Sequence, residues 1–524
     1  MVAAVAGLDD VQEDGGTARW PLDLADESAT VAFARFIAGE VRSGDLITLS
    51  GDLGAGKTTF ARSLIRVLAA DPWLEIPSPT FTLMQVYDTS FGRIVHADLY
   101  RINDPDELAE LGWEEAAEDA LVIVEWPERA RNVLAADRLD ITFQLPPDAS
   151  EGHRVASLKG YGTWQQRLGI AKAVRGVLAG AGWQDATRNH IQGDASTRAY
   201  ERLTTTAGET AILMIAPRRP DGPPVRRGKP YSAIARLAES VEPFVAMANG
   251  LRALGFSAPE IFAADLDAGI LLLEDFGTEP IVDVFGPMPD RYAGAVAALA
   301  ALHTMEPARI LPIAPGRDHK IPAYDIEALL IEVELLLEWY APHQARVALP
   351  AVARASFTAA WTEVLAEIVA GPNTWTLRDY HSPNLLWLQG RDGVKRVGVL
   401  DFQDTVIGHP AYDTVSLLQD ARVTVYPELE LKLLGTYAAA RRQASGDFDF
   451  GAFARAYSIL GAQRATKLLG IFTRLHKRDH KPQYLRHLSR IEAYLARNLT
   501  HPVLSPLKVW YETHLPRVLA GPQS

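Results

Sequence analysis

The sequence predicts an α/β fold divided over more than one domain. Helix-like and strand-like hydrophobic patterns alternate along the chain, which excludes an all-β class. A strand-rich stretch at about 193–277 precedes a region where helices dominate, an order typical of a small β-rich lobe joined to a large helical lobe. The chain has 524 residues, of which 48% are hydrophobic. At roughly 100–200 residues per domain, this length supports two to four domains, each with its own core.

Domain boundaries are predicted where the hydrophobic pattern lapses. The N-terminal residues are small and polar, and residues 145–153 (L-P-P-D-A-S-E-G-H) are rich in turn formers. A helical pattern at 164–181 is expected to open the second domain. The predicted organisation is a flexible N-terminus (1–17), a first domain (18–160), and a second domain (164–524) with a small lobe at about 187–277 and a large lobe at about 285–524.

The formal net charge of −13 argues against a general nucleic-acid binder, which needs a basic surface to displace counterions. The chain has no cysteine, so disulfides, thiolate metal sites and cysteine nucleophiles are excluded. No apolar run approaches the ~20 residues of a membrane-spanning helix, and no secretory signal pattern is visible. We therefore expect a cytoplasmic protein that does not bind a membrane and is not a general nucleic-acid binder.

A phosphate-binding motif is predicted early in the first domain. A helix is expected at 28–41, an apolar strand at 45–50 and a helix from Thr58. Between strand and helix, G-D-L-G-A-G-K-T matches G-x-x-x-x-G-K-T. Glycines let backbone N–H groups turn toward phosphates, the helix N-terminus adds partial positive charge, and Lys57 can reach the β- and γ-phosphates. The expected nucleotide contacts are Gly51, Asp52, Gly54, Ala55, Gly56, Lys57, Thr58 and Thr59.

Two acidic residues end apolar strands downstream of this motif. Asp98 follows a strand at 93–97, and Glu125 follows a strand at 121–124. Ligands of open α/β sheets gather at the carboxyl ends of strands, so both carboxylates can converge on a metal ion and the γ-phosphate. Taken alone, each would more often be a solvated acid at the end of a strand.

Four tetrapeptide or hexapeptide motifs follow the phosphate loop in order: S-P-T-F at 78–81, H-A-D-L-Y-R at 96–101, E-L-G-W at 110–113 and E-W-P-E at 125–128. With the loop, they resemble the TsaE family, bacterial ATPases required for threonylcarbamoyladenosine formation on tRNA. The resemblance covers about 18–160. It implies ATP-driven engagement of protein partners that carry the threonylcarbamoyl transfer.

The same resemblance assigns roles to four residues of the first domain. It implies that Thr58 and Glu125 bind Mg²⁺ and that Asp98 is catalytic, through positioning water or metal. It further implies that Thr80 lies nearest the γ-phosphate, in a nucleotide-sensing switch. From the residues alone, the proline-rich segment around Thr80 is a stiff turn and is often only that.

A second set of catalytic candidates lies in the second domain. R-D-Y-H-S-P-N places Asp379 and Asn384 five residues apart after a strand, and Asp401 follows another apolar strand. Kinase chemistry needs such a trio, because one aspartate aligns the acceptor hydroxyl and takes its proton while an asparagine and a second aspartate hold Mg²⁺. Positioning and charge neutralisation then supply most of the catalysis.

These segments resemble the aminoglycoside phosphotransferase superfamily over about 164–514, which implies ATP, Mg²⁺, Asp379 as catalytic base, and Asn384 and Asp401 as metal ligands. The resemblance places L-L-L-E-D-F-G, with Glu274, at the interlobe hinge. It places G-D-A-S-T-R-A-Y-E-R-L at the nucleotide-covering loop, where the expected contacts are Ser196, Thr197 and Arg198. That block narrows the resemblance to kinases that phosphorylate the anomeric hydroxyl of N-acetylmuramate and N-acetylglucosamine in cell-wall recycling.

The second domain departs from the kinase pattern at two positions. Leu377 stands where a histidine is common, and Met214 lies in the strand that normally carries a phosphate-binding lysine. Another cation must then neutralise the phosphates. The candidates are Arg198, Arg218 and Arg219.

Alternative functions stay open at this level. The acceptor could be an aminoglycoside, a choline-like alcohol or another hydroxyl metabolite, and cationic acceptors would need an acidic pocket. Potential pocket residues are Glu332, Glu334, Glu338, Trp339 and Tyr340, for which helix packing is an equal interpretation. The missing lysine also permits a non-catalytic, nucleotide-binding scaffold. His303, on an apolar helix, is expected to be structural.

Overall fold

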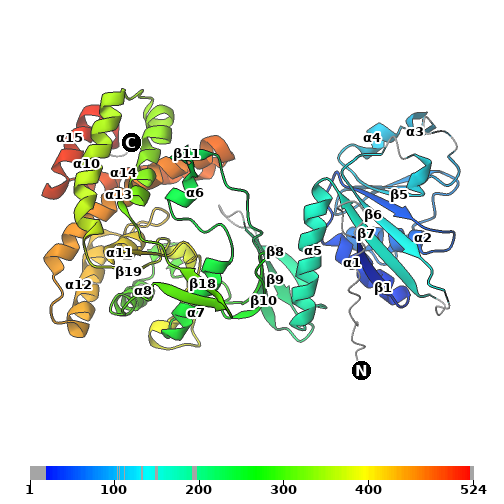
Figure 1. Ribbon diagram of the computed structural model, residues 1–524, viewed down its shortest axis with the longest axis horizontal. Helices are drawn as coiled ribbons and strands as arrows, with labels where there is room; N and C mark the ends of the chain where they lie inside the picture. Colours follow the sequence, from blue (N-terminus) through cyan, green and yellow to red (C-terminus); the bar gives the residue numbers. More distant parts are fainter. Residues whose placement is uncertain are drawn as a thin grey trace. The chain divides into compact units, whose positions relative to one another are not determined.

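The computed structural model describes residues 19–102, 104, 107–110, 112–130, 134–147, 152–191 and 198–519. Two expected nucleotide contacts, Ser196 and Thr197, lie outside these residues. The described chain forms two compact units that divide after Ala179, each with its own hydrophobic core (Figure 1). The α/β class with β-rich and helical lobes is confirmed. Within the described part of the chain, no helix has the length and apolar character needed to cross a membrane.

A seven-stranded mixed sheet forms the first unit, in the order β1-β7-β6-β2-β5-β4-β3. Strand β2 pairs in parallel with β5 and β6, and β4 pairs in parallel with β5. The carboxyl ends of β2, β5 and β4 therefore meet at one edge of the sheet. The strands are β1 (Trp20–Leu24), β2 (Leu46–Ser50), β3 (Met84–Asp88), β4 (Arg93–Asp98), β5 (Leu121–Glu125), β6 (Arg138–Gln144) and β7 (Arg154–Tyr161).

Helices cover both faces of this sheet. Phe33 of α1 and Phe60 of α2 share one core, with ring centroids 4.9 Å apart, and Trp113 belongs to a core on the other face. The carboxylate of Asp26 accepts the backbone N–H of Ala29 at 2.8 Å and so caps α1. The bounds are α1 (Glu27–Ala38), α2 (Lys57–Ala69), α3 (Glu107–Glu110), α4 (Trp113–Ala117) and the 3-10 turn η1 (Pro127–Arg129).

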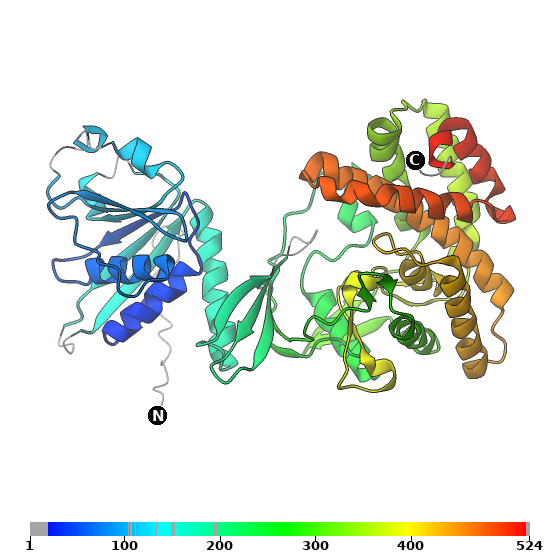
Figure 2. The same cartoon turned by 180° about the vertical axis from the view of Figure 1, so that it is seen from behind.

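Helix α5 (Thr163–Gly180) packs on the first unit, whereas the sequence assigned it to the second (Figure 2). Trp164 and Leu168 are buried in the first unit's core. Arg167 donates to both carboxylate oxygens of Asp45, at 2.6 and 2.7 Å, and lies 3.8 Å from the Trp164 ring. The helical pattern was predicted correctly, but an apolar stripe does not indicate which neighbouring core it will join.

The small lobe of the second unit is a five-stranded antiparallel sheet in the order β13-β14-β10-β9-β8. On the central strand β10, Met214 lies opposite Leu271 and Tyr200 and is buried. The elements are β8 (Thr187–Ile191), β9 (Ala199–Thr204), β10 (Thr210–Ile215), β11 (Pro224–Arg226), β12 (Lys229–Pro230), α6 (Tyr231–Ile234), α7 (Glu242–Ala253), β13 (Ile261–Asp265) and β14 (Ile270–Glu274).

Helices build the large lobe around α13, which has 30 residues. The helices are α8 (Pro289–Leu302), α9 (Ile326–Leu335), the π-helix η2 (Leu336–Ala345), α10 (Ala351–Val369), α11 (Ala411–Leu418), α12 (Pro427–Ala444), α13 (Phe450–Asp479), α14 (Leu488–Asn498) and α15 (Ser505–His514). Short 3-10 helices are η3 (Ser382–Asn384), η4 (Gly393–Arg396), η5 (Pro482–His487), η6 (Pro502–Leu504) and η7 (Pro516–Leu519).

Four short strand pairs complete the large lobe and carry the catalytic segments. Strand β19 pairs with β22, and β20 pairs with β21, all antiparallel. The strands expected at 374–377 and 397–400 are both present, but each has a partner that the sequence pattern did not reveal. The strands are β15 (Val282–Asp283), β16 (Gly286–Pro287), β17 (Ile310–Ala314), β18 (Arg317–Lys320), β19 (Thr374–Thr376), β20 (Leu385–Trp387), β21 (Val397–Val399) and β22 (Val406–Gly408).

The packing of α5 predicts which unit a core substitution destabilises. Trp164→Ala removes a fully buried indole, so we expect the first unit to lose about 3–5 kcal/mol of unfolding free energy. Calorimetry of the full chain should show one thermal transition shifted downward and the other unchanged. Trp73→Ala is the matched control, because Trp73 is 88% exposed in the same unit. If the first unit had the same transition temperature in Trp164→Ala as in Trp73→Ala, the assignment of α5 to that unit would be contradicted.

Candidate functional sites

The phosphate loop of the first unit holds its lysine inward. Lys57 opens α2, and its Nζ donates to the carbonyl oxygens of Gly51 and Asp52 at 2.8 and 3.0 Å. The indole of Trp126 lies 3.9 Å from the same atom. Burial lowers the pKa of Lys57, and the carboxylate of Glu125 opposes this effect. The sequence indicated Lys57 but not Trp126, which approaches from the end of β5.

The ends of β4 and β5 bring together the other residues expected in the first site. Thr58 Oγ1 donates to Glu125 Oε2 at 2.8 Å, and Asp98 is the parallel neighbour of Glu125. Thr80 Oγ1 donates to Asp98 Oδ2 at 2.9 Å. Both carboxylates are buried. Hydroxyl and carboxylate oxygens suit Mg²⁺, so this group has the donor chemistry that a Mg²⁺–nucleotide complex requires.

His96 is a member of this group that the sequence did not single out. Its Nε2 lies 3.0 Å from Glu125 Oε1, and both side chains are buried. Glu125 thus has Thr58 on one carboxylate oxygen and His96 on the other, which restricts its rotation. The available signal was spacing, because His96 precedes Asp98 by two residues on β4 and therefore faces the same side of the strand.

The backbone of the phosphate loop is fixed from two other strands. Arg154 of β7 donates from Nε to the carbonyl oxygen of Ala55 at 3.1 Å and from Nη2 to that of Gly54 at 3.3 Å. Gly51 has φ of +134°, and a Cβ there would lie 2.3 Å from the carbonyl oxygen of Phe143. Only glycine fits that close approach of the loop to β6.

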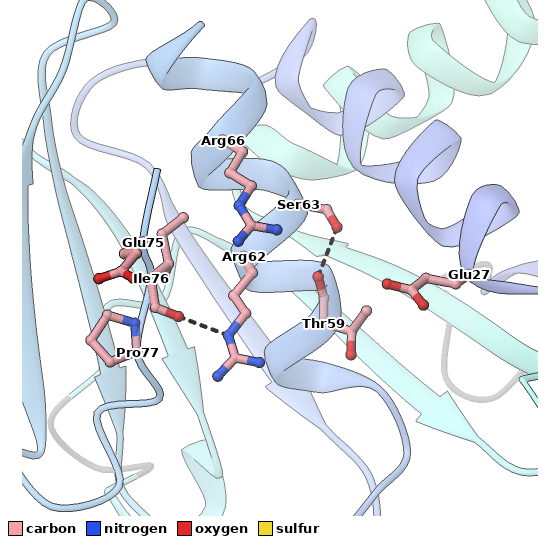
Figure 3. Close-up of a pocket in the computed structure, with 8 residues that line it drawn as sticks. All are labelled: Glu27, Thr59, Arg62, Ser63, Arg66, Glu75, Ile76 and Pro77. Carbon is pink, nitrogen blue, oxygen red and sulfur yellow. Dashed lines mark hydrogen bonds between the residues drawn. The ribbon is translucent and has the colours of Figure 1, made fainter. Parts of the chain in front are cut away.

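A cleft of about 440 Å³ opens beside the phosphate loop, along α2 (Figure 3). Arg62 Nε donates to the carbonyl oxygen of Ile76 at 2.8 Å, and Arg66 Nε donates to that of Leu74 at 3.1 Å. These bonds tie the helix that begins at the loop to the segment that leads into Thr80. The lining residues are Glu27, Thr59, Arg62, Ser63, Arg66, Glu75, Ile76 and Pro77.

The three residues expected in the kinase-like site converge in the large lobe. Asn384 Nδ2 donates to the backbone oxygen of Asp379 at 2.9 Å and lies 3.5 Å from Asp401 Oδ2. The pairing of β20 with β21 produces this approach, because Asn384 precedes one strand and Asp401 follows the other. Arg198 Nη1 donates to Asp401 Oδ1 at 3.0 Å. The amide and carboxylate oxygens are donors that fit Mg²⁺.

Asp379 lies close to a guanidinium group and an imidazole ring. Arg464 Nη2 of α13 lies 3.7 Å from Asp379 Oδ1, and His381 Nε2 lies 3.8 Å from the same oxygen. Desolvation favours the protonated carboxyl, but the cationic neighbours, Arg464 foremost, outweigh it and lower the pKa of Asp379 to about 2. Its side chain remains 36% exposed. Asp379 is thus ionised at neutral pH and accessible to an acceptor.

Buried ion pairs hold the loop that carries Asp379. Asp413 accepts the backbone N–H groups of Leu377 and Arg378 at 2.6 and 2.8 Å. Arg378 has a left-handed backbone, with φ of +70°, and its guanidinium pairs with buried Glu332. Lys467 of α13 lies 2.8 Å from the same carboxylate.

The remaining nucleotide candidates occupy different surroundings. Arg218 and Arg219 are exposed on the chain after β10, whereas Arg198 contacts Asp401. The carboxylate of Glu274 pairs with Arg391 and lies 3.6 Å from Arg252. Its side chain is therefore engaged within the protein, so a nucleotide contact at this position would have to use the backbone.

The acidic candidates of the large lobe do not form an open acidic pocket. Glu332, Glu334 and Glu338 each pair with an arginine, namely Arg378, Arg226 and Arg354. Tyr340 is buried and donates to Glu492 Oε1 at 2.5 Å. His303 is buried against the hydroxyl of Tyr437 at 2.8 Å, and burial lowers its pKa well below the usual value. Helix packing thus accounts for Tyr340 and His303.

Both units match models of known families. The model described as "Threonylcarbamoyl adenosine biosynthesis protein TsaE" matches residues 24–154, and the model described as "Phosphotransferase enzyme family" matches residues 187–454. The chain belongs to both families. It is accordingly an enzyme with an ATPase unit and a phosphotransferase unit, called here the TsaE unit and the kinase unit.

Individual relatives cover each unit. An N-acetylmuramate/N-acetylglucosamine kinase of Caulobacter vibrioides is 39% identical over 352 residues, which are 65% of this chain and 95% of that protein. A kinase of the same name from Pseudomonas putida is 33% identical over 58% of this chain and 80% of that protein. The tRNA threonylcarbamoyladenosine biosynthesis protein TsaE of Rickettsia felis is 37% identical over 26% of this chain and 78% of that protein.

The kinase unit is predicted to lose stability in mild acid. Burial lowers the pKa of His381 and His409 to about 4, against about 6.5 in an unfolded chain. Between those values the unfolded state binds more protons, so each histidine lowers the unfolding free energy by roughly 3 kcal/mol as the pH drops from 6.5 through 4. Burial raises the pKa of Asp413 to about 7, which offsets the effect of one histidine and leaves a net loss. Urea unfolding of the full chain at pH 5 and pH 7 measures this dependence.

The substitution His409→Asn tests how much His409 alone contributes to the pH dependence of the unfolding free energy. His409 Nδ1 accepts the backbone N–H of Ala411 at 3.1 Å, and the amide oxygen in His409→Asn can take that role without titrating. We expect the unfolding free energy of this variant to change less between pH 5 and pH 7 than that of the wild type. His480→Asn is the control, because His480 is exposed and has a left-handed backbone that asparagine tolerates. If the unfolding free energy of His409→Asn depended on pH as steeply as that of the wild type, the claim that His409 is buried in its neutral form would be contradicted.

Proposed function

We propose that one polypeptide carries two ATP-dependent activities in the cytoplasm. The TsaE unit hydrolyses ATP in support of threonylcarbamoyladenosine formation on tRNA. The kinase unit phosphorylates the anomeric hydroxyl of N-acetylmuramate or N-acetylglucosamine, a reaction of cell-wall recycling. Both families use ATP, generally with Mg²⁺. The observation that carries the kinase proposal is the convergence of Asp379, Asn384 and Asp401 in a unit related to kinases of that name.

The TsaE unit would hold Mg²⁺ through Thr58 and Glu125, with Asp98 and Thr80 positioning the attacking water. Lys57 has to exchange its bonds to loop carbonyls for bonds to phosphate, and the low-dielectric setting strengthens the new contact. Membership in the family implies partnership with the tRNA modification complex. We infer that protein subunits of that complex, rather than tRNA, contact this unit, in keeping with the net charge of −13.

In the kinase unit, Asp379 orients the acceptor hydroxyl. The new bond joins the sugar oxygen to the γ-phosphorus as the bond to the β,γ-bridging oxygen breaks, and the hydroxyl proton passes to Asp379. A carboxylate with a pKa of about 2 takes this proton late, which suits a loose transition state in which the nucleophile gains acidity only near the end. Asn384 and Asp401 supply the oxygens for Mg²⁺, which neutralises phosphate charge.

Arg198 is the cation we propose in place of the missing lysine. It reaches Asp401 from the start of β9 and therefore lies at the metal-ligand end of the site, whereas Arg218 and Arg219 are exposed elsewhere. A guanidinium there can move from the carboxylate to phosphate oxygens, for which its planar fork is suited.

Charge in the large lobe bears on the choice of acceptor. A cationic aminoglycoside needs unpaired carboxylates, but Glu332, Glu334 and Glu338 already have arginine partners. An uncharged or anionic sugar is the better match. A non-catalytic nucleotide-binding scaffold is the second candidate, and buried Met214 in place of the usual lysine is the observation that favours it.

The ATPase proposal predicts a separable loss of function. Lys57→Ala removes the cation of the phosphate loop, so ATP hydrolysis by the TsaE unit and tRNA modification should fail in cells that lack other copies. Asp379→Asn is the control in the same chain and should leave modification intact. The readout is the threonylcarbamoyladenosine content of total tRNA. Full modification with Lys57→Ala would refute the ATPase role.

The kinase proposal predicts the complementary result. Asp379→Asn should lower kcat by about 100-fold or more, because the hydroxyl loses its orienting carboxylate and proton acceptor. Asp392→Asn is the matched control, since the Asp392 side chain is 99% exposed. The full chain is incubated with Mg²⁺-ATP and amino sugars, aminoglycosides or choline, and products are identified by mass and phosphate position. ATP binding without any product would support the scaffold instead.

A further inference from the structure

Gln403 is a buried glutamine two positions after Asp401, the aspartate expected to bind Mg²⁺ in the kinase unit. Its side chain amide donates from Nε2 to Asp401 Oδ1 at 2.7 Å, and the residue is 5% exposed. The other amide atom, Oε1, is buried and has no hydrogen-bond partner within the part of the chain that the structure describes. Buried polar atoms are rarely left without a partner, so this oxygen points to a ligand.

The contact with Asp401 determines which way the amide of Gln403 faces. An ionised carboxylate only accepts hydrogen bonds, so the NH₂ group of the amide has to face it, and the reversed amide would set two acceptor oxygens against each other. The oxygen and nitrogen of one amide are at most about 2.6 Å apart, so Oε1 of Gln403 lies within about 5.3 Å of Asp401 Oδ1. The unpartnered oxygen therefore belongs to the surroundings of the metal-binding aspartate.

The two carboxylate oxygens of Asp401 have different surroundings. Oδ1 accepts Gln403 Nε2 at 2.7 Å and Arg198 Nη1 at 3.0 Å. Oδ2 lies 3.5 Å from Asn384 Nδ2, which is a longer contact. The Asp401 side chain is 39% exposed, so solvent ions can reach it. Two donors thus engage Oδ1, and Oδ2 is the oxygen better placed to bind a metal ion.

Of the two donors on Oδ1, only Gln403 is expected to stay there when ATP is bound. Arg198 is the cation proposed above to move from Asp401 to phosphate oxygens, and that move removes one of the two bonds. Gln403 is uncharged and buried, so its bond to the carboxylate does not depend on the phosphates. The orientation of Asp401 in the nucleotide complex would then depend on Gln403.

The residues on either side of Gln403 are anchored to the small-lobe side of the unit. The ring of Phe402 is buried and stacks on Phe244 of α7, with centroids 4.8 Å apart. Asp404 Oδ1 accepts the backbone N–H of Ala238 at 2.7 Å. Because its neighbours are held in this way, Gln403 has a fixed backbone from which its amide can orient another side chain.

Two properties of Mg²⁺ connect the two ends of this amide. The ion usually keeps several of its waters, and these waters donate hydrogen bonds to acceptors on the protein. Residues that orient a metal ligand also have large effects on metal affinity. We propose that Gln403 is a positioning residue of the kinase metal site, whose NH₂ group holds Asp401 so that Oδ2 is left for the ion and whose carbonyl oxygen accepts a hydrogen bond from a water of the hydration shell. This inference rests on the proposed kinase function.

Titration of the full chain with Mn²⁺ in the presence of ADP, followed by electron paramagnetic resonance, tests this role without turnover. All proteins carry Lys57→Ala to weaken nucleotide binding by the TsaE unit, and Asp401→Asn defines the signal from other sites. Gln403→Met keeps the size of the side chain but removes both polar atoms. It should weaken the Asp401-dependent binding of Mn²⁺ by about tenfold or more and change metal-free binding of ADP by less than about twofold.

Gln419→Met is the matched control. Gln419 is another buried glutamine of the kinase unit, but its amide exchanges hydrogen bonds with Asn498, at 3.2 and 2.8 Å. Its substitution should lower the thermal stability of the unit, because a buried amide loses its partner, and leave the affinity for Mn²⁺ unchanged. The control therefore separates a loss of packing from a loss of metal binding.

The outcomes separate this inference from the function on which it rests. If Asp401→Asn bound Mn²⁺ as well as its parent, the kinase metal site itself would be refuted, and Gln403 with it. If Asp401→Asn lost Mn²⁺ while Gln403→Met bound it as tightly as the parent, the role of Gln403 alone would be refuted. Loss of metal-free ADP binding in Gln403→Met, or an equal loss of Mn²⁺ binding in Gln419→Met, would also refute that role, because either result indicates a general loss of structure. Only a selective loss of Mn²⁺ binding in Gln403→Met supports the proposal.

Discussion

The catalytic loop of the kinase unit depends on one buried carboxylate. Glu332 of α9 pairs with Arg378 of the loop and with Lys467 of α13. Loss of Glu332 would leave two cations, Arg378 and Lys467, buried without the carboxylate between them, which costs several kcal/mol. The interaction fixes Arg378 in a left-handed backbone that aims the next residue, Asp379, outward. Helices α9 and α13, far apart in sequence, are thereby joined to the segment that carries Asp379.

The TsaE unit positions its site in a different way. Its acids stand at the ends of neighbouring parallel strands, so the register of β4 against β5 already places Asp98 beside Glu125. Side-chain bonds from Thr58, Thr80 and His96 then set the orientation of each carboxylate. In the TsaE unit the strand register therefore sets most of the positions of the site residues. In the kinase unit buried ion pairs do so. Both arrangements bring together side-chain oxygens of the kind that Mg²⁺ prefers.

Sequence patterns were most informative where function needs a contiguous motif. The glycines and Lys57 of the phosphate loop, and the spacing of Asp379 and Asn384, were visible because local backbone geometry imposes them. Contacts between distant segments were not visible. Trp126 over Lys57 and Arg464 beside Asp379 depend on which strand ends and helices become neighbours. Glu274 is a further example, since its motif was visible in the sequence but the ion pair of its side chain with Arg391 was not.

The course of α5 has a practical consequence for dissecting the protein. The helix completes the core of the TsaE unit through Trp164 and ends at Gly180, and β8 of the kinase unit begins at Thr187. A fragment that starts at Trp164 would therefore carry an orphaned apolar helix, and the remaining N-terminal fragment would expose the surface that this helix covers. Residues 181–186 are the place where the two halves can be expressed separately with neither core opened.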